Sequence, residues 1–475
     1  MDSLRYIFLM RHELILVLVA LIILITDLFV SPGRKPRLIK FSLFLFTFGM
    51  LIGFLPVQPG TLFGGSFQGN ALTDFFKDVL NLAVLIVFLQ SDGYLKNAEN
   101  STKAGEFFVL ILLTLTGMDF MISSGDFLTF FIGLETASIP LAGLVAFDRH
   151  KSRSAEAGVK LILLSALSSG VLLFGLSLIY GATGSIYFDD IAGHITASPL
   201  IIFGFIFFIT GMGFKISLVP FHLWTADVYE GAPVNITAYL SVVSKGAAAF
   251  ILTIILYKVF KNITGLWETS LYVLAVLTMT VGNLFALRQD NIKRFLAFSS
   301  IAQAGYILLG IMGTGGLGMS TVVYFVLIYV FTNLGAFGVA SAISNASGVE
   351  TISGYNGLYS TNPKLSLLMM LSLFSLAGIP PVAGFFGKFF LFTSAGNKGY
   401  FILILIAVIN ATIALYYYLS VVKAMFINKN DHPVPYFRSP NTMRLGLIIC
   451  VLGVVFTGVF GNIFEYIMSL SHPLF

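Results

Sequence analysis

The chain has 475 residues, of which 57% are hydrophobic and only 10% are charged. Soluble domains carry about 25% charged residues, so this composition excludes a soluble enzyme and indicates a polytopic membrane protein. The net charge of +5 comes mostly from lysines and arginines between apolar segments, which gives no reason to expect a nucleic-acid partner. The chain has one cysteine, Cys450, and six histidines without paired spacing, so we expect it to bind no redox cofactor or metal of its own.

Long apolar segments follow one another along the whole chain and predict an all-α membrane protein with one domain, residues 1–475. A bilayer span needs roughly 17–25 apolar residues, and about fourteen segments meet this requirement. The first has no small-residue cleavage signature and is predicted to be retained as a helix. The predicted spans are 14–30, 38–56, 75–91, 104–123, 126–147, 156–180, 199–225, 233–257, 267–287, 292–312, 317–343, 365–394, 400–426 and 443–468.

The lysines and arginines between these spans are unevenly divided. Most lie in alternate loops, from the one with Arg34 and Lys35 to the one with Arg438. Because positively charged loops stay in the cytoplasm, this division predicts both termini on the outer face of the membrane. The opposite set of loops carries only Arg5, Arg11, Lys258, Lys261 and Lys398.

Four ionisable residues lie near the middle of predicted spans: Glu135, Lys215, Lys245 and Lys388. A charge at this depth costs about 2.5–3.5 kcal/mol on insertion scales, whereas a buried polar contact between helices contributes only about 0.6 kcal/mol. Ion pairs that merely hold helices together would not offset that cost. We therefore interpret these residues as carriers of charge in the membrane.

Lysine suits this task because burial lowers the pKa of an amino group toward neutral pH, and a carboxylate nearby raises that pKa again. Movement of Glu135 relative to Lys215 would then switch the lysine between binding and releasing a proton. Lys77, at a helix end, is predicted to extend to the water–lipid boundary. Lys160 lies about one turn inside its span, where that same role and a role in proton transfer both stay open. The role of Asp27 also stays open.

Prolines interrupt two of the spans beside these lysines. Pro220 comes five residues after Lys215, and the pair Pro380 and Pro381 comes shortly before Lys388. Backbone groups freed by a break at membrane depth are tolerated only inside protein or beside a hydrated cavity. Two such breaks at corresponding positions indicate an ion path near the middle of the membrane.

The first break contains a histidine, His222, which can titrate near neutral pH. It is a candidate for the proton path, and a hydrogen-bonded structural role is the alternative. The stretch that follows, TADVYEGAPVNIT (225–237), predicts by its composition an ordered loop on the cytoplasmic side before the eighth span.

The segment PFHLWTADVYEGAPVNITAYLSVVSKGAA (220–248) resembles the antiporter-like membrane subunits of respiratory complex I, the proton-pumping NADH:quinone oxidoreductase. Its DVYEGAP form, and the FIGLE context of Glu135, are similar to subunit N of that complex. Subunits L and M read closer to PFHTWLPDAHVEAP in the first region, and subunit M tends to have FWE in the second. The resemblance covers nearly the whole chain and is clearest from about residue 100 to 425. The segment TASIPLAGLVAF departs from the family pattern at Pro140, which leaves the geometry of that helix open.

The resemblance implies two inverted five-helix repeats, residues 104–258 and 266–426, with broken seventh and twelfth helices. Quinone reduction elsewhere in the complex would drive charge along the family's buried residues, with protons taken up from the cytoplasm and released outside. Matched by motif, helices five, six, seven, eight and twelve would contribute in turn Glu135, Lys160, Lys215, Lys245 and Lys388.

The same resemblance implies partners and a location. FMN, the iron–sulfur clusters and quinone would belong to other subunits of the membrane and peripheral arms, in a bacterial inner membrane. The alternatives are a subunit of an Mrp-type cation/proton antiporter and a scaffold whose buried charges are relics. The electron donor, the choice between ubiquinone and menaquinone, and the number of protons moved stay open.

Overall fold

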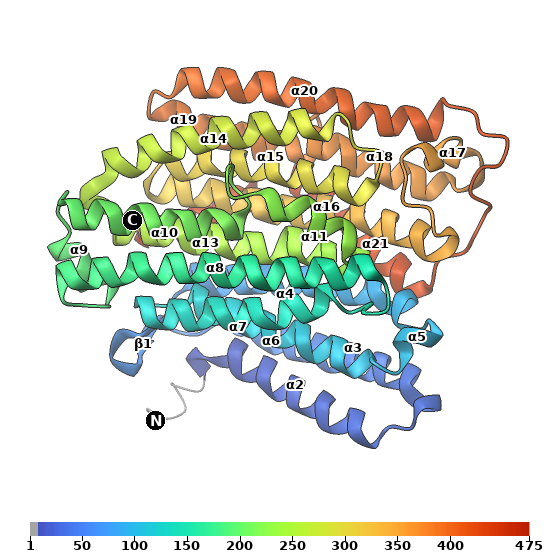
Figure 1. The fold of residues 1–475 in the computed structure, drawn as a ribbon, viewed down its shortest axis with the longest axis horizontal. Helices are drawn as coiled ribbons and strands as arrows, with labels where there is room; N and C mark the ends of the chain where they lie inside the picture. The colour runs from blue at the N-terminus through green and yellow to red at the C-terminus, as the bar shows by residue number, and fades with distance from the viewer. Residues whose placement is uncertain (1–7, 475) are drawn as a thin grey trace.

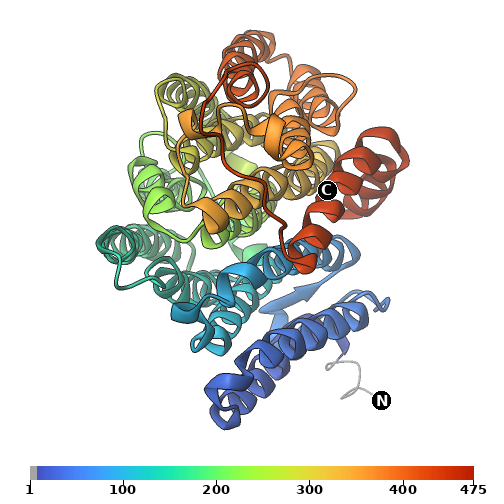
Figure 2. The same cartoon turned by 90° about the vertical axis from the view of Figure 1, so that its right-hand side faces the viewer.

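The structure is a computed structural model that describes residues 8–474. The N-terminus, including Arg5 and its predicted place on the outer face, lies outside the described residues. Helices make up most of the described chain and run side by side along the horizontal axis of Figure 1, and Figure 2 shows the same bundle nearly end-on. The predicted all-α fold is confirmed.

The helices follow one another with short connections. The long and interrupted ones are α2 (Arg11–Phe29), α3 (Lys35–Gly53), α4 (Ala71–Leu95), α6 (Ala104–Ile122), α7 (Phe127–Val145), α8 (Ser152–Thr183), α10 (Pro199–Ile216), α11 (Leu223–Gly231), α12 (Val234–Tyr239), α13 (Lys245–Lys258), α14 (Thr264–Ala286), α15 (Ile292–Met312), α16 (Gly315–Ser347), α18 (Pro363–Ala377), α19 (Ala383–Asn397), α20 (Phe401–Phe426), α21 (Asn441–Val459) and α22 (Asn462–Ser471). Shorter helices in the connections are α5 (Ala98–Ser101), α9 (Phe188–His194) and α17 (Leu358–Thr361).

Within residues 8–474, twelve helices are long and apolar enough to cross a membrane. The count of fourteen spans would add α4, which carries four charged side chains, and the interrupted pair α18 and α19; it stays a prediction. The apolar stretches of α15 and α16 are 100% buried, whereas those of α2 and α20 are 33% buried. The first pair therefore forms the centre of the bundle and the second pair lies at its periphery.

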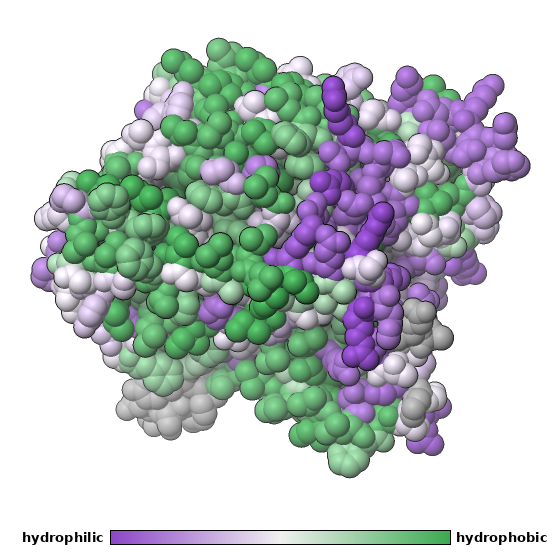
Figure 3. Space-filling model, in the orientation of Figure 1, coloured by the Kyte–Doolittle hydropathy of each residue, from purple (hydrophilic) through white to green (hydrophobic). Residues whose placement is uncertain are grey.

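The surface has the polarity of a membrane protein. Hydrophobic side chains cover most of the face in Figure 3, and hydrophilic side chains gather toward the right-hand end, where α5 and α17 lie in Figure 1. Many large apolar side chains are exposed on this bundle, among them Phe29, Phe44 and Ile402. Such a surface needs lipid around it, so the chain is embedded in a membrane and crosses it several times.

One sequence-based prediction about local structure is wrong, and one local feature was not predicted. The stretch 225–237 is mostly helical, because α11 and α12 bury apolar side chains such as Val228 and Ile236 and leave only Ala232 and Pro233 between them. The connection from α3 to α4, which the sequence did not mark as β-structure, folds into a hairpin of β1 (Gly60–Leu62) and β2 (Phe67–Gly69), with Gly60 opposite Gly69.

Lys77 corrects a second prediction. Its side chain does not reach the water–lipid boundary, because α2 and β2 cover this end of α4 and leave it 0% exposed. The ammonium group instead pairs with Glu13 at 2.5 Å and lies 5.1 Å from the centre of the Phe67 ring. Asp27, whose role the sequence left open, pairs with Lys35 where α2 turns into α3.

Candidate functional site

The first predicted break lies between α10 and α11. α10 ends at Ile216, and Ser217 has a φ of 67°, which turns the chain out of the helix. Two hydrogen bonds hold the broken segment in protein: the Val219 amide donates to the Thr278 hydroxyl at 3.0 Å, and Trp224 donates to the Phe214 carbonyl at 3.1 Å. The freed backbone groups are therefore partly satisfied inside the bundle, as a break at membrane depth requires.

The second break separates α18 from α19 and creates a binding place for Lys388. Gly378, with a φ of 84°, ends α18, and the chain re-enters a helix at Ala383. The Lys388 ammonium donates to the carbonyl oxygens of Leu376 at 2.8 Å and Ala377 at 3.1 Å. These are carbonyls at the helix end that have no intrahelical partner, so the break supplies the acceptors for a lysine that is only 5% exposed.

Lys215 binds two hydroxyl groups from two other helices. It comes from the last turn of α10 and donates to Ser138 of α7 at 2.6 Å and to Ser165 of α8 at 2.8 Å. α7 continues through Pro140 without interruption, so the departure from the family pattern does not displace Ser138 from the lysine. The predicted partner Glu135 lies one turn before Ser138 on the same helix.

No ion pair joins Glu135 to Lys215 within the described part of the chain. The carboxylate of Glu135 instead accepts a hydrogen bond from the Ser169 hydroxyl. Ser169 and Ser165 are four residues apart on α8, so they lie on one face of that helix. The two charged groups are thus separated by serine hydroxyl groups on neighbouring turns of α7 and α8 and make no direct contact.

Lys245 is the most enclosed point of the site. A π-helical segment, Leu240–Ser244, precedes it and widens the helix, as π-bulges often do at functional sites. The side chain is 4% exposed and donates to the Ser300 hydroxyl of α15 at 2.6 Å. On its other side the ammonium lies 5.3 Å from the centre of the Tyr229 ring. Its partners are therefore a hydroxyl and an aromatic face.

α15 connects Lys245 to Lys388. Gln303 lies one turn after Ser300 and donates to the Leu376 carbonyl at 3.1 Å, which is the same oxygen that Lys388 binds. A small cavity of about 10 Å³, lined by residues that include Gln303 and Lys388, leaves room for about one water molecule. Polar groups therefore continue from one buried lysine to the next.

His222 lies between the two halves of the first broken helix. It is 8% exposed, and its Nδ1 atom has no hydrogen-bond partner among the described residues. A buried polar atom without a partner is costly, so this nitrogen is suited to a water molecule or to a transferred proton. The structure leaves both predicted roles of His222 possible, because the ring is neither fully bonded nor in contact with a carboxylate.

Lys160 lies apart from this line, in a network of ion pairs. Its ammonium binds Glu156 at 2.7 Å and Asp227 at 2.9 Å, and Arg294 binds Asp227 at 2.7 Å and Glu230 at 3.0 Å. The network lines a cavity of about 200 Å³, and the Lys160 side chain is 38% exposed. This network is therefore open to the surface of the bundle, and Lys160 is not one of the buried lysines, which are Lys215, Lys245 and Lys388.

The sequence analysis missed several members of this site. Asp227 and Glu230 lie in the stretch that was predicted to be a loop. Both belong to α11, where their spacing of three residues allows both to bind Arg294. The serines at 138, 165, 169 and 300 carried no signal, because serine is common in apolar helices. Asp119 lies in a predicted apolar span and was also passed over, although a carboxylate in that position is unusual.

Comparisons with known proteins identify the family and the fold. The family model described as NADH:quinone oxidoreductase/Mrp antiporter, TM, matches residues 124–414. A relative from Phocaeicola vulgatus, named NADH-quinone oxidoreductase subunit N, is 47% identical over 463 residues, which is 97% of this chain and 98% of that one. A chain in a structure of respiratory complex I from Thermus thermophilus has a TM-score of 0.79 at 27% identity, over 96% of this chain and 98% of that one.

A likeness of fold alone links the chain to a second group of proteins. A chain of the Mrp complex from Dietzia sp. has a TM-score of 0.87 at 20% identity, over 99% of this chain and 97% of that one. The identity to subunit N relatives is much higher and extends over the whole length. The chain therefore belongs to the NADH-quinone oxidoreductase subunit N family, one of the antiporter-like membrane subunits.

Proposed function

We propose that this chain is a proton-translocating subunit in the membrane arm of an NADH:quinone oxidoreductase. The observation that carries the proposal is the bonding of its buried lysines. Lys215, Lys245 and Lys388 make no ion pair within the described residues and bind only hydroxyl groups, carbonyl oxygens and aromatic faces. A structural role would favour paired charges, whereas an unpaired buried lysine can change its protonation state without leaving a partner charge behind.

The hydroxyl partners suit a proton carrier in both of its states. A serine hydroxyl accepts a hydrogen bond from an ammonium group and can donate one to a neutral amine. Ser138 and Ser165 at Lys215, and Ser300 at Lys245, can therefore stay bonded while the lysine gains or loses a proton. The carbonyls at Lys388 can only accept, so transfer from this lysine requires another acceptor, such as a water molecule in the adjoining cavity.

The route runs in one direction through the bundle. Protons are taken up from the cytoplasm near the cavity lined by Lys160 and Asp227. From there, charge passes along the buried residues Glu135, Lys215, Lys245 and Lys388. The repeats 104–258 and 266–426 each supply one broken helix, as inverted repeats in transporters do. Their breaks lie beside Lys215 and Lys388.

The redox chemistry belongs to partner subunits. FMN, iron–sulfur clusters and quinone are implied by the family, but an iron–sulfur cluster needs several thiolates and this chain has only Cys450, which is buried beside Gln90. The chain then acts by receiving a change of charge or conformation from other membrane-arm subunits and, through them, from the peripheral arm. In this proposal it resides in a bacterial inner membrane with both termini outside.

The test compares the assembled complex with and without Lys388, reconstituted in lipid vesicles. With NADH and a quinone, Lys388→Ala should lose most of the proton gradient, by about tenfold or more, because a positioned proton-transfer group contributes about 10²–10⁴-fold. Lys398→Ala is the matched control, since that lysine is 40% exposed and binds only Glu268. Pumping at the wild-type level in Lys388→Ala would refute the proposal, and sodium-driven proton exchange without quinone would favour the Mrp-type antiporter instead.

A further inference from the structure

A second group of buried ionisable residues lies away from the lysine line, at the end of the bundle that carries β1. Three helices supply it: α2, α4 and α6. Its members are Arg11, His12, Glu13, Asp74, Lys77, Asp78 and Asp119. We propose that this cluster, named here the α2–α4–α6 cluster, is a separate proton-binding site that exchanges protons with water through the cavity at Asp74 and Asp78.

The permanent charges of the cluster do not balance. The cluster holds four carboxyl groups, on Glu13, Asp74, Asp78 and Asp119, but only two permanently cationic side chains, Arg11 and Lys77. Arg11 binds Asp74 at 3.0 Å and Lys77 binds Glu13 at 2.5 Å, so both cations are already paired. Two carboxyl groups remain without a cation, in a place where an uncompensated charge is expensive.

Asp119 is the clearer example of a carboxyl group without a cation. Its side chain is 0% exposed, and neither of its carboxyl oxygens has a hydrogen-bond partner among the described residues. The charged groups that act on it are Lys77 and Glu13, followed by Asp78 and Asp74. Protonation removes the charge that burial disfavours, so a proton is the simplest ligand for this carboxyl group.

Two of the other helices packed on α6, α7 and α13, do not supply the missing cation. Asp126, at the start of α7, accepts a hydrogen bond from the Thr129 amide, and Lys258, at the end of α13, donates to Gln68 at 3.1 Å. A metal ion is not favoured either, because no group of three or more His, Cys, Asp or Glu side chains with suitable geometry occurs in residues 8–474. Protons therefore remain as the balancing charge.

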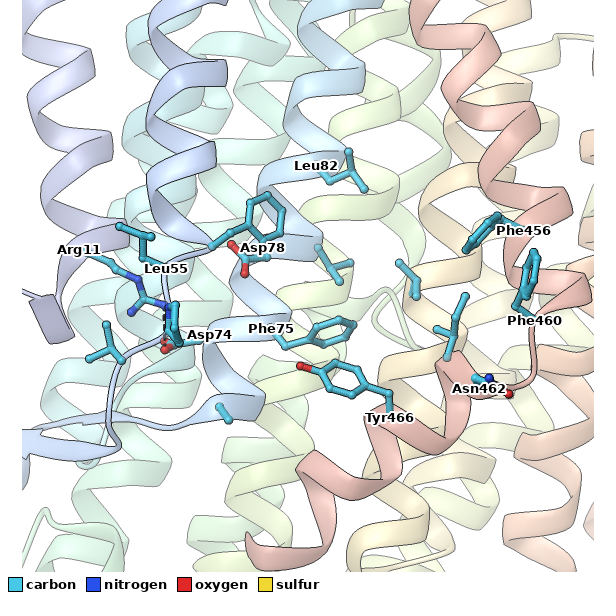
Figure 4. A pocket seen from close by; sticks show the side chains of 17 residues that line it. Arg11, Leu55, Asp74, Phe75, Asp78, Leu82, Phe456, Phe460, Asn462 and Tyr466 are labelled. Carbon is cyan, nitrogen blue, oxygen red and sulfur yellow. Dashed lines mark hydrogen bonds and ion pairs between the residues drawn. The ribbon is translucent and has the colours of Figure 1, made fainter.

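A cavity gives this cluster access to water. Its volume is about 720 Å³, and both Asp74 and Asp78 line it. Figure 4 shows these two carboxylates on α4 beside Arg11, with Phe456 and Phe460 of α21 across the cavity. Their side chains are 12% and 13% exposed, unlike Asp119. The cluster therefore has a partly exposed rim at the cavity and a fully buried interior.

His12 of α2 lies beside Asp78, one of the two carboxyl groups that line the cavity. Its Nε2 atom lies 3.9 Å from Asp78, and its Nδ1 atom lies 3.4 Å from the Asn81 amide nitrogen. Glu13 is the next residue on α2, and its second carboxyl oxygen has no hydrogen-bond partner among the described residues.

The cluster also lies next to the helix that carries Lys245. Tyr239, the last residue of α12, shares a hydrogen bond of 2.6 Å with Thr114 of α6 and contacts the Met118 sulfur at 3.9 Å. Lys245 begins α13 after the intervening π-helical segment. The site therefore lies between the buried lysine line and the end of the bundle opposite α5 and α17 (Figure 1). Its existence does not depend on the function proposed for that line.

Infrared difference spectroscopy of the assembled complex tests the proposal, because a protonated carboxyl group has a C=O stretching band that a carboxylate lacks. At neutral pH the wild-type complex should show such a band, and Asp119→Asn should lose it. Glu106→Gln is the matched control, an exposed carboxyl group in the first turn of the same helix. A band of wild-type intensity in Asp119→Asn would overturn the proposal, whether or not the complex pumps protons.

A second variant tests the route to water and covers the case in which Asp119→Asn does not assemble. Ala71 lines the cavity and is exposed, so Ala71→Trp fills space at the rim without touching the buried carboxyl group. After transfer to heavy water, the isotope shift of the carboxyl band should be slower in Ala71→Trp than in the wild type. An unchanged exchange rate would show that protons reach the site by another way and would overturn the assignment of this cavity.

Discussion

We expect Lys215→Ala to lower NADH-driven proton pumping by the assembled complex about tenfold or more, the scale set by the loss of a positioned proton-transfer group. Lys215 is the only described side chain that joins the hydroxyl groups of α7 to those of α8, through Ser138 and Ser165. Alanine removes the titratable group and separates Glu135 from the rest of the line. Pumping is measured as acidification or alkalisation of the vesicle lumen for each quinone reduced.

Two controls separate loss of the proton carrier from loss of structure. Lys215→Arg keeps the positive charge and hydrogen-bond donors but cannot release a proton, so it should pump as poorly as Lys215→Ala while assembling better. Ser138→Ala removes only one of the two hydroxyl partners and should have a smaller effect. Full pumping in the arginine variant would contradict the role of Lys215 as a carrier.

We expect Lys77→Met to destabilise the chain by about 3–5 kcal/mol, because it leaves Glu13 charged and buried without a partner. Glu13 is 1% exposed and its second oxygen already lacks a hydrogen bond, so no nearby group replaces the ammonium. The double variant Glu13→Gln and Lys77→Met should recover most of the loss. The measurement is the temperature at which the purified complex loses this subunit.

A surface pair in the same chain provides the comparison. Lys398 and Glu268 are 3.7 Å apart, and Lys398 is 40% exposed. Lys398→Met should therefore change stability by no more than about 1 kcal/mol. If Lys77→Met were equally mild, the pairing of Lys77 with Glu13 would contribute little, and the description of these two side chains as fully buried would be wrong.

The architecture was largely predictable because lipid imposes a simple rule on sequence. Backbone groups must be bonded within a span, so each long apolar run must be a helix, and the positions of the long helices follow from the runs. The two breaks were also predictable, because proline removes a backbone donor. The hairpin β1–β2 was not, because its two strands have only three residues each and are too short to leave a periodic pattern.

The site was predictable only in its charged members. Lysines at 215, 245 and 388 stand out because charge in an apolar span is rare, but the serines that bind them do not. Lys77 was misjudged because its distance from the helix end suggested access to water, whereas α2 and β2 fold over it. Whether a side chain near a helix end is exposed depends on distant segments, and a single span does not contain that information.

In the proposed function, Lys215 and Lys388 act in series on one proton path. The most direct test is the double variant Lys215→Ala and Lys388→Ala, compared with both single variants for pumping per quinone reduced. The effects of mutating two groups that act as a unit do not add. The double variant should therefore pump no worse than whichever single variant pumps less. Losses that multiply, or single variants that both pump normally, would mean that no connected line of protons passes between the two broken helices.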